Sequence, residues 1–198
     1  AAVLYVWQGG QEGGAGAADV LTGTVTPCGK LSDTIALDIS DYPSTEGFGD
    51  PTRVIYKEDI YVGYRYFETF AKDCVLYPFG YGLSYTTFTR TVESFDFDGE
   101  TVTEKVTVKN TGKVDGETVV QLYIQDVTGS MIRPIKELKN FQKVMLKAGE
   151  QKVVHFTITE DDLKFFNAQL KYAAEPGKFN VQIGLDSEDV TQQSFELL

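Results

Sequence analysis

From about residue 89 to the end of the chain, apolar and polar residues alternate with a period of two. A period of two is typical of strands that bury one face and expose the other. Turn sequences such as "NTGKVDGE", "KAGEQ", "EPGK" and "GLDSED" separate these runs. About seven strands at this spacing predict an antiparallel β-sandwich over residues 89–198. The residues predicted to face its core are Val102, Val106, Val108, Val120, Leu122, Ile124, Val154, Phe156 and Ile158.

The sandwich is predicted to be of the fibronectin type III-like variety of the immunoglobulin-like folds. The chain lacks the Cys…Trp…Cys spacing of true immunoglobulin domains. A short helical turn is expected at "TEDDLKFF", where Thr159 and Asp162 have the spacing of a capping box.

Residues 1–35 have a different pattern, that of a single β-α unit. The apolar run "AVLYV" predicts a strand buried on both faces, as in a parallel sheet. A helix through Ala15, Ala18, Val20 and Leu21 should follow and end at Gly23. One such unit cannot form an α/β sheet alone, so we expect the rest of that layer to lie outside this chain.

Residues 36–88 show no clear period and are rich in Tyr, Asp, Gly and Pro, with one short strand predicted at Val54–Tyr56. Such a long irregular segment is improbable in a compact domain unless another surface holds it. We therefore predict an extended linker that lies over a neighbouring domain. Within it, Arg65 is expected to pair with Glu58 or Asp59.

Charge and composition exclude several classes of function. The net charge of −11 repels a polyanion, so no nucleic acid partner is expected. No apolar run approaches the roughly 20 residues that span a bilayer, so no membrane association is predicted. The apolar start lacks the basic residues of a signal peptide. These features favour a cytoplasmic location.

The potential metal ligands and nucleophiles are few and scattered. Cys28 and Cys74 are predicted to be free buried thiols, with a disulfide as the alternative. The single histidine, His155, is expected on the solvent face of a strand. No metal site, no cofactor and no nucleophile-histidine pair is predicted.

The segment "WQGGQEGGAGAADVLTG" is the part of the sequence that looks most like a site. It lacks the Lys-Ser/Thr of a phosphate loop, and Glu12 would repel phosphate. Trp7, Gln11 and Glu12 are weak candidates for sugar contacts; the favoured alternative is that Glu12 caps the helix and Trp7 packs at a domain seam. A retaining glycosidase needs two carboxyl groups about 5–5.5 Å apart, and no partner for Glu12 is evident. No catalytic residue is assigned.

Three motifs in this sequence resemble glycoside hydrolase family 3, which includes bacterial and fungal β-glucosidases and β-xylosidases. They are "WQGGQEGGAGAADVLTGTVTPCGKL", "VIYKEDIYVGYRYFETF" and "LYPFGYGLSYTTF". The resemblance covers essentially the whole chain and is to the C-terminal portion of these enzymes. It implies that residues 1–35 end an α/β sandwich domain, that residues 36–88 are the linker, and that residues 89–198 form the fibronectin type III-like domain.

The resemblance also implies that the nucleophilic Asp lies on a barrel domain and the acid/base Glu upstream of Trp7. Glu12 matches the family's "GQE" position, which is not catalytic. The main hypothesis is a non-catalytic, bracing portion of a retaining β-glucosidase, inactive alone. Its partners would be the barrel and α/β sandwich domains, and β-glucoside or oligosaccharide through the parent enzyme. The alternative is a stand-alone carbohydrate- or protein-binding module. Specificity for glucosides, xylosides or N-acetylglucosaminides and the domain order stay open.

Overall fold

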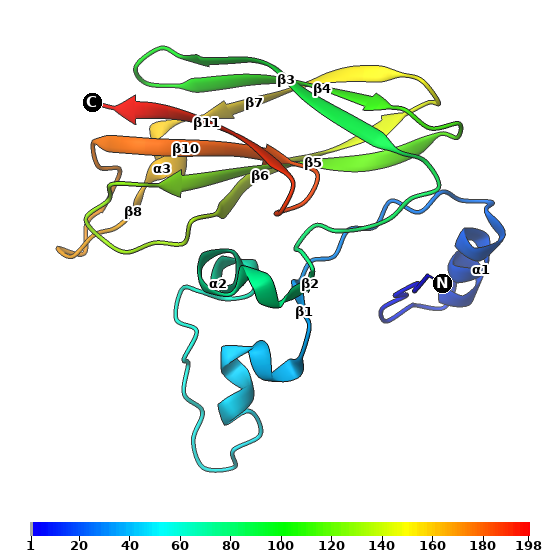
Figure 1. The fold of residues 1–198 in the computed structure, drawn as a ribbon, viewed down its shortest axis with the longest axis horizontal. Helices are drawn as coiled ribbons and strands as arrows, with labels where there is room; N and C mark the ends of the chain where they lie inside the picture. The colour runs from blue at the N-terminus through cyan, green and yellow to red at the C-terminus, as the bar shows by residue number, and fades with distance from the viewer. Residues whose placement is uncertain (1) are drawn as a thin grey trace.

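The structure, a computed structural model, describes residues 2–198, and its main body is a sandwich of two antiparallel sheets (Figure 1). One sheet has four strands in the order β11-β10-β5-β6, and the other has three in the order β3-β4-β7. This arrangement confirms the predicted seven-stranded sandwich. The strands are β3 (Phe88–Phe97), β4 (Val102–Asn110), β5 (Gly116–Asp126), β6 (Glu137–Leu146), β7 (Gln151–Ile158), β10 (Gly177–Gly184) and β11 (Val190–Leu197).

The core lies between the two sheets and contains every residue predicted for it. All nine predicted core residues are buried. Val106 lies opposite Val154 in the β4–β7 ladder, so their side chains share the inward face. Phe179 and Phe195 stack at 5.4 Å near one end. Burial of such side chains contributes about 1.5–3 kcal/mol each, which makes this interface the main source of stability.

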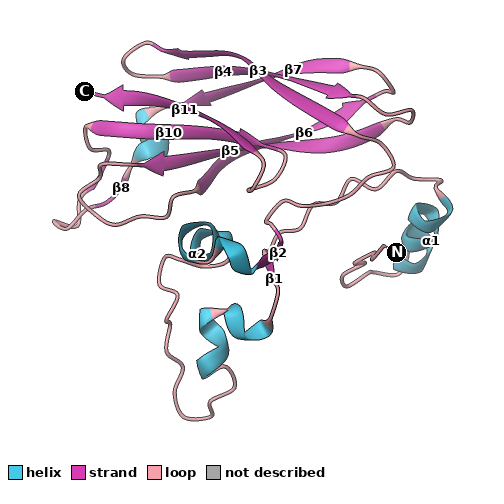
Figure 2. Ribbon diagram, in the orientation of Figure 1, coloured by secondary structure: helices cyan, strands magenta, loops and turns pink. Residues whose placement is uncertain are grey.

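The outer face of the four-stranded sheet is also covered, which the period-two pattern did not predict. Gln121 and Tyr123 point away from the core, yet both are buried. Helix α2 (Tyr64–Phe70) lies beneath this sheet (Figure 2), and the rings of Tyr64 and Tyr123 are 5.8 Å apart. The prediction of a half-buried strand is therefore wrong for β5, because a distant segment covers its polar face.

Residues 35–77 form an arm whose two ends pair with each other. The short strands β1 (Ile35–Ala36) and β2 (Val75–Tyr77) close its neck. The segment predicted to be an extended linker, residues 36–88, contains helical turns as well as extended chain. The predicted strand at Val54–Tyr56 is not formed, because no other strand in residues 2–198 lies beside it. Besides α2, the arm contains three 3-10 turns, Ile39–Asp41, Pro43–Gly47 and Lys72–Cys74.

The N-terminal β-α unit is only partly formed. Helix α1 (Gly13–Thr22) ends at Gly23, whose φ of 79° and N–H bond to the carbonyl of Val20 confirm the predicted stop. No residue of α1 is buried. The apolar run before it is exposed and is not a strand, since a strand needs a partner and the described residues supply none.

The predicted helical turn is present as α3 (Glu160–Leu163). The carboxylate of Asp162 accepts a hydrogen bond from the backbone N–H of Thr159 at 2.8 Å, which confirms the capping interaction. A small hairpin of β8 (Phe165–Phe166) and β9 (Tyr172–Ala173) follows.

Cys28 and Cys74 are free thiols, as predicted, although both are half-buried rather than fully buried. Among residues 2–198 there is no helix with the length and apolar character needed to cross a membrane. The same residues contain no cluster of His, Cys, Asp and Glu suited to a metal ion.

Candidate functional site

The three residues predicted for sugar contact lie together on the turn that leads into α1. Trp7 is 68% exposed, has a φ of 59° and packs edge-to-face against Tyr5 at 5.3 Å. Gln11 is exposed as well. Glu12 occupies the N-cap position, but its side chain makes no capping bond, so the predicted capping role is wrong. These side chains are available for contact and are not organised into a built site.

The mixed-charge stretch around Arg65 is not the ion-pair cluster that the sequence suggested. Among the described residues, Arg65 forms no ion pair with Glu58 or Asp59. Its guanidinium instead lies 5.8 Å from the ring centre of Tyr64, and its Nε atom is buried without a hydrogen-bond partner. His155 is exposed on β7, as predicted.

A buried ion pair joins the arm to the sandwich at a place that sequence reasoning missed. Glu68 on α2 and Lys136, just before β6, are both buried, and their charged atoms are 2.8 Å apart. The hydroxyl of Ser187 donates to the second oxygen of Glu68 at 2.7 Å, and Lys136 also donates to the carbonyl of Ser187. Each charge is therefore paired and hydrogen-bonded, as buried charges require.

Further hydrogen bonds reinforce this junction. The backbone N–H of Leu138 donates to the hydroxyl of Tyr64 at 2.8 Å, and that of Ile135 donates to Thr69 at 3.3 Å. The bond from Leu138 holds α2 against β6. The bond from Ile135 holds α2 against the loop that precedes β6. Lone charged residues such as Lys136 give no sequence pattern, which is why the junction was not predicted.

The turn at Gly80 fits closely under the same sheet. Gly80 has a φ of 82°, and a Cβ atom there would lie 2.2 Å from the amide nitrogen of Gln121. Gln121 donates to the carbonyl of Leu185 at 3.1 Å and accepts from the hydroxyl of Tyr123. Burial raises the pKa of Tyr123, so its hydroxyl stays a donor. The positive φ favours glycine here, and any larger residue would require the side chain of Gln121 to move.

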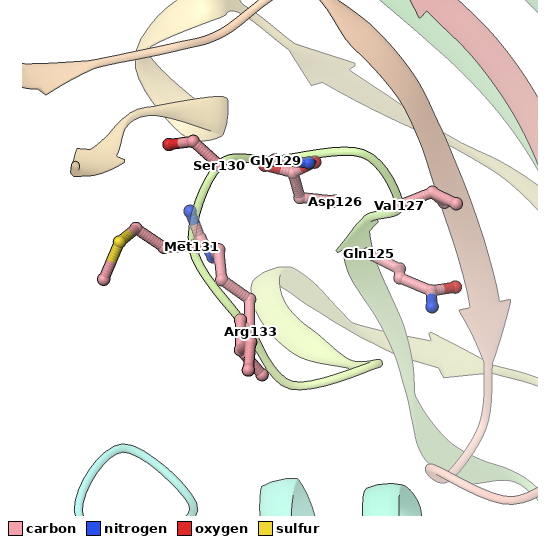
Figure 3. Close-up of a pocket in the computed structure, with 8 residues that line it drawn as sticks. Gln125, Asp126, Val127, Gly129, Ser130, Met131 and Arg133 are labelled. Atoms are coloured by element: carbon pink, nitrogen blue, oxygen red, sulfur yellow. The ribbon is translucent and has the colours of Figure 1, made fainter. Parts of the chain in front are cut away.

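Two pockets lie on the sandwich side of the molecule. One, of about 330 Å³, lies at the loop between β5 and β6; Figure 3 shows Asp126, Ser130, Met131 and Arg133 around it. The other, of about 290 Å³, lies where Cys28, Lys30 and Tyr81 meet the sandwich. Burial lowers the pKa of Lys30, whose amine donates to the carbonyl of Gly82 at 3.1 Å.

The arm exposes many large apolar side chains. Phe48 and Tyr56 are 91% and 90% exposed, far more than is usual for aromatic residues. Apolar exposure on this scale marks a surface that contacts another protein surface. The large apolar residues of the arm that are more than half exposed are Leu37, Ile39, Phe48, Val54, Tyr56, Val62 and Phe70.

The fold therefore defines a fibronectin type III-like sandwich with a docked arm that exposes apolar side chains, preceded by helix α1. Comparison with known proteins agrees. Residues 118–187 match the fibronectin type III-like domain, and residues 1–85 match the glycosyl hydrolase family 3 C-terminal domain. The chain belongs to glycoside hydrolase family 3 and corresponds to its C-terminal portion.

Similar proteins support this assignment along nearly the whole chain. A periplasmic beta-glucosidase of Salmonella typhimurium is 49% identical over 205 residues, which cover 100% of this chain and 26% of the relative. A beta-glucosidase of Ruminococcus albus is 44% identical over 93% of this chain and 20% of the relative. Beta-glucosidase 3B of Thermotoga neapolitana superposes with a TM-score of 0.88 at 42% identity, over 98% of this chain and 28% of that chain.

The chain thus spans between a fifth and about a quarter of the length of these two curated relatives. The relatives come from both bacteria and fungi, since a probable beta-glucosidase I of Aspergillus flavus is 42% identical over 99% of this chain.

Proposed function

We propose that the chain is the C-terminal, non-catalytic portion of a retaining β-glucosidase that hydrolyses terminal β-D-glucosides in carbohydrate metabolism. The observation that carries this proposal is the coverage: relatives named as beta-glucosidases match 93–100% of this chain, which accounts for 20–26% of their own length. The names also favour glucosides over xylosides and N-acetylglucosaminides as substrates.

In this proposal residues 1–35 complete an α/β sandwich domain, residues 36–88 connect it, and residues 89–198 form the fibronectin type III-like domain. The nucleophile and the acid/base lie in parts of the enzyme outside these 198 residues. Trp7, Gln11 and Glu12 stay candidates for contact with substrate or with a neighbouring domain. No cofactor is required, since glycoside hydrolysis by this route needs only carboxyl groups and water.

The physical role of the chain is to brace the catalytic domains. The exposed apolar residues of the arm and the uncovered face of α1 supply the surface on which barrel and α/β sandwich domains would pack. The buried Glu68–Lys136 pair holds the base of the arm against the sandwich. The arm is therefore attached to the sandwich at its base and exposes apolar side chains to a neighbouring domain elsewhere.

Enzyme assays test whether the catalytic residues lie outside this chain. The purified 198 residues are expected to show no hydrolysis of an aryl β-glucoside, whereas the full-length enzyme is expected to hydrolyse it. Turnover by the 198 residues alone would contradict the proposal.

A matched pair of variants tests the bracing role. Phe48→Ser on the arm and Phe141→Ser on β6 each replace an exposed phenylalanine, 91% and 61% exposed respectively. In the isolated chain both should change the free energy of unfolding little. In the full-length enzyme Phe48→Ser should destabilise by about 3 kcal/mol, because a buried aromatic is lost, and Phe141→Ser should not. Equal effects in the full-length enzyme would rule out the arm as the bracing surface.

We place the enzyme in the cytoplasm on the basis of its two free thiols, which a reducing compartment preserves. One relative is named as periplasmic. Fractionation of cells that express the full-length gene decides between the two compartments.

A further inference from the structure

Lys30 lines the cavity of about 290 Å³ that lies where two distant segments of the chain meet the sandwich. Backbone hydrogen bonds hold these segments together. The N–H of Leu31 donates to the carbonyl of Tyr81 at 2.8 Å, and the N–H of Gly80 donates to the carbonyl of Leu31 at 2.8 Å. Lys30 directly precedes this pairing, so the fold fixes the position of its backbone.

Lys30 differs from the other lysines of the chain because it is half-buried without a counter-ion. Among residues 2–198, every other lysine is either exposed or within 4.0 Å of a carboxylate oxygen. The amine of Lys30 instead donates to the carbonyl of Gly82 at 3.1 Å. A neutral amine keeps this hydrogen bond, whereas an ion pair would favour the charged form.

Burial changes the charge state of this amine. It lowers the pKa of Lys30, because the ammonium form loses its hydration; the charges of Asp186 and Cys28 act in the opposite direction and do not outweigh burial. A larger share of the Lys30 amine is therefore neutral at pH 7 than of an ordinary exposed lysine. The neutral amine is the form that attacks a carbonyl carbon.

The groups around the amine belong to the wall of the cavity. Gly82, which accepts its hydrogen bond, lines the cavity, and so do Cys28 and Asp186, whose charges act on it. The amine therefore lies at the cavity wall, where a small molecule inside the cavity would meet it. The other titratable side chains of the lining are those of Tyr81, Glu117 and Asp189.

The accessible carboxylates of the lining indicate which carbonyl compounds fit. The side chains of Glu117 and Asp189 are 35% and 82% exposed. Each is paired with a cation, but a carboxylate has about four acceptor sites, so both can still accept hydrogen bonds from hydroxyl groups. A volume of about 290 Å³ is small for a ligand pocket and suits a molecule of a few carbon atoms. The open-chain form of a short aldose has both the aldehyde and the hydroxyls.

We propose that Lys30 is a covalent modification site that condenses with the aldehyde of a short open-chain aldose. The lone pair of Nζ forms a bond to the carbonyl carbon. The carbonyl oxygen leaves as water with the two hydrogens of the neutral amine, and an imine then joins the sugar to Lys30. The step needs no oxidant, reductant or cofactor. The proposal goes beyond the hydrolase function and does not depend on it.

Reductive trapping tests the proposal, because cyanoborohydride converts an imine into a stable secondary amine. The 198-residue chain is treated at pH 7 with D-glyceraldehyde and sodium cyanoborohydride, and the modified lysines are located by mass spectrometry of peptides cut after glutamate. Lys30 should be modified at least about threefold faster than Lys152, because a lower pKa leaves more neutral amine.

Lys152 is the matched control within the same chain. Its amine also donates to a backbone carbonyl, that of Met145 at 2.7 Å, but 48% of its side chain is exposed and Glu150 lies 3.6 Å away. In guanidinium chloride, where the chain is unfolded, the two lysines should react at similar rates. The proposal is overturned if Lys152 reacts as fast as Lys30 in the folded chain, or if the difference persists after unfolding.

Lys30→Arg provides a second test. Arginine keeps a donor for the carbonyl of Gly82 but has no amine that forms an imine with glyceraldehyde. The variant should lose the fastest modification seen in the intact mass and keep the rate at Lys152. An unchanged fastest rate in this variant would assign the reactivity to another lysine and contradict the proposal.

Discussion

Glu104 is a carboxylic acid in the core of the sandwich. It lies on β4 between Val102 and Val106, on the inward face, and only 2% of its surface is exposed. Phe95 and Phe156 are its cross-strand neighbours, and its Oε2 atom has no hydrogen-bond partner. Burial in this apolar setting raises the pKa of Glu104 to about 7, because the charged form loses its hydration.

The raised pKa makes the stability of the fold depend on pH. The folded state holds the Glu104 proton up to about pH 7, whereas the unfolded chain releases it near the ordinary value of 4.5. The free energy of unfolding should therefore fall by up to about 3 kcal/mol as pH rises from 4.5 to 7, and stay low above that.

Urea unfolding at pH 5 and pH 8 measures this effect. In Glu104→Gln the pH dependence between these values should flatten, since glutamine does not ionise. Glu93→Gln, on the exposed face of neighbouring β3, is the control and should keep the dependence of the unmodified chain. The same pH dependence in both variants would show that another group is responsible.

Gly80 provides a prediction about packing. Gly80→Ala introduces a methyl group 2.2 Å from the side-chain nitrogen of Gln121, in addition to the strain of a φ of 82°. Gly149→Ala has nearly the same backbone strain, at a φ of 78°, but open space around the new methyl group. Thermal unfolding should show Gly80→Ala to be about 2 kcal/mol more destabilising. Equal losses would mean that Gln121 moves aside without cost.

At the scale of elements, the attachment of α2 to the sandwich depends on the pair of Glu68 and Lys136. Lys136→Met leaves the carboxylate of Glu68 buried without its counter-ion and should cost about 3–5 kcal/mol in urea unfolding. Glu117 and Lys143 form a more exposed pair, with 35% and 51% of their side-chain surfaces accessible. Lys143→Met should cost less than about 1 kcal/mol.

Glu68→Gln combined with Lys136→Met completes the comparison. If the pair acts as a unit, the double variant should be more stable than the sum of the two single losses predicts, because no charge is left buried alone. Strict additivity of the two losses would show that the two side chains act independently.

The strands were predictable where their pattern is local. β4 and β7 alternate as expected because one of their faces meets the core and the other meets water. The burial of Tyr123 on β5 was not predictable, because α2 covers it from a segment far away in the sequence. The apolar run before α1 has the composition of a buried strand, but composition does not supply the neighbouring strand that it needs.

The candidate site shows the same limit. The glycines around Glu12 drew attention because they form a recognisable motif. Lys136 is a single charged residue in the sequence, and only its burial beside Glu68 makes it notable. Such properties depend on the whole fold, so no sequence window contains them.

At the scale of the whole molecule, the arm combines a firmly attached base with an exposed tip. Arg53 lies in the exposed tip, between Gly49 and Gly63. Trypsin should therefore cleave the isolated chain first after Arg53, and the two fragments should stay associated through the neck, where β1 of one fragment pairs with β2 of the other. In the full-length enzyme the same bond should be protected. Mass spectrometry of early products checks this, and a first cut within the sandwich strands would contradict it.

The closed neck of the arm also has a mechanical consequence. β1 and β2 run antiparallel side by side, so a force that pulls on the tip of the arm acts along both strands in the same direction. The tension is divided between two covalent backbones, and the hydrogen bonds of the neck are not sheared. Movement of a domain that binds the tip would thus be transmitted through covalent bonds in two directions, along the chain after β2 to the sandwich and along the chain before β1 to helix α1.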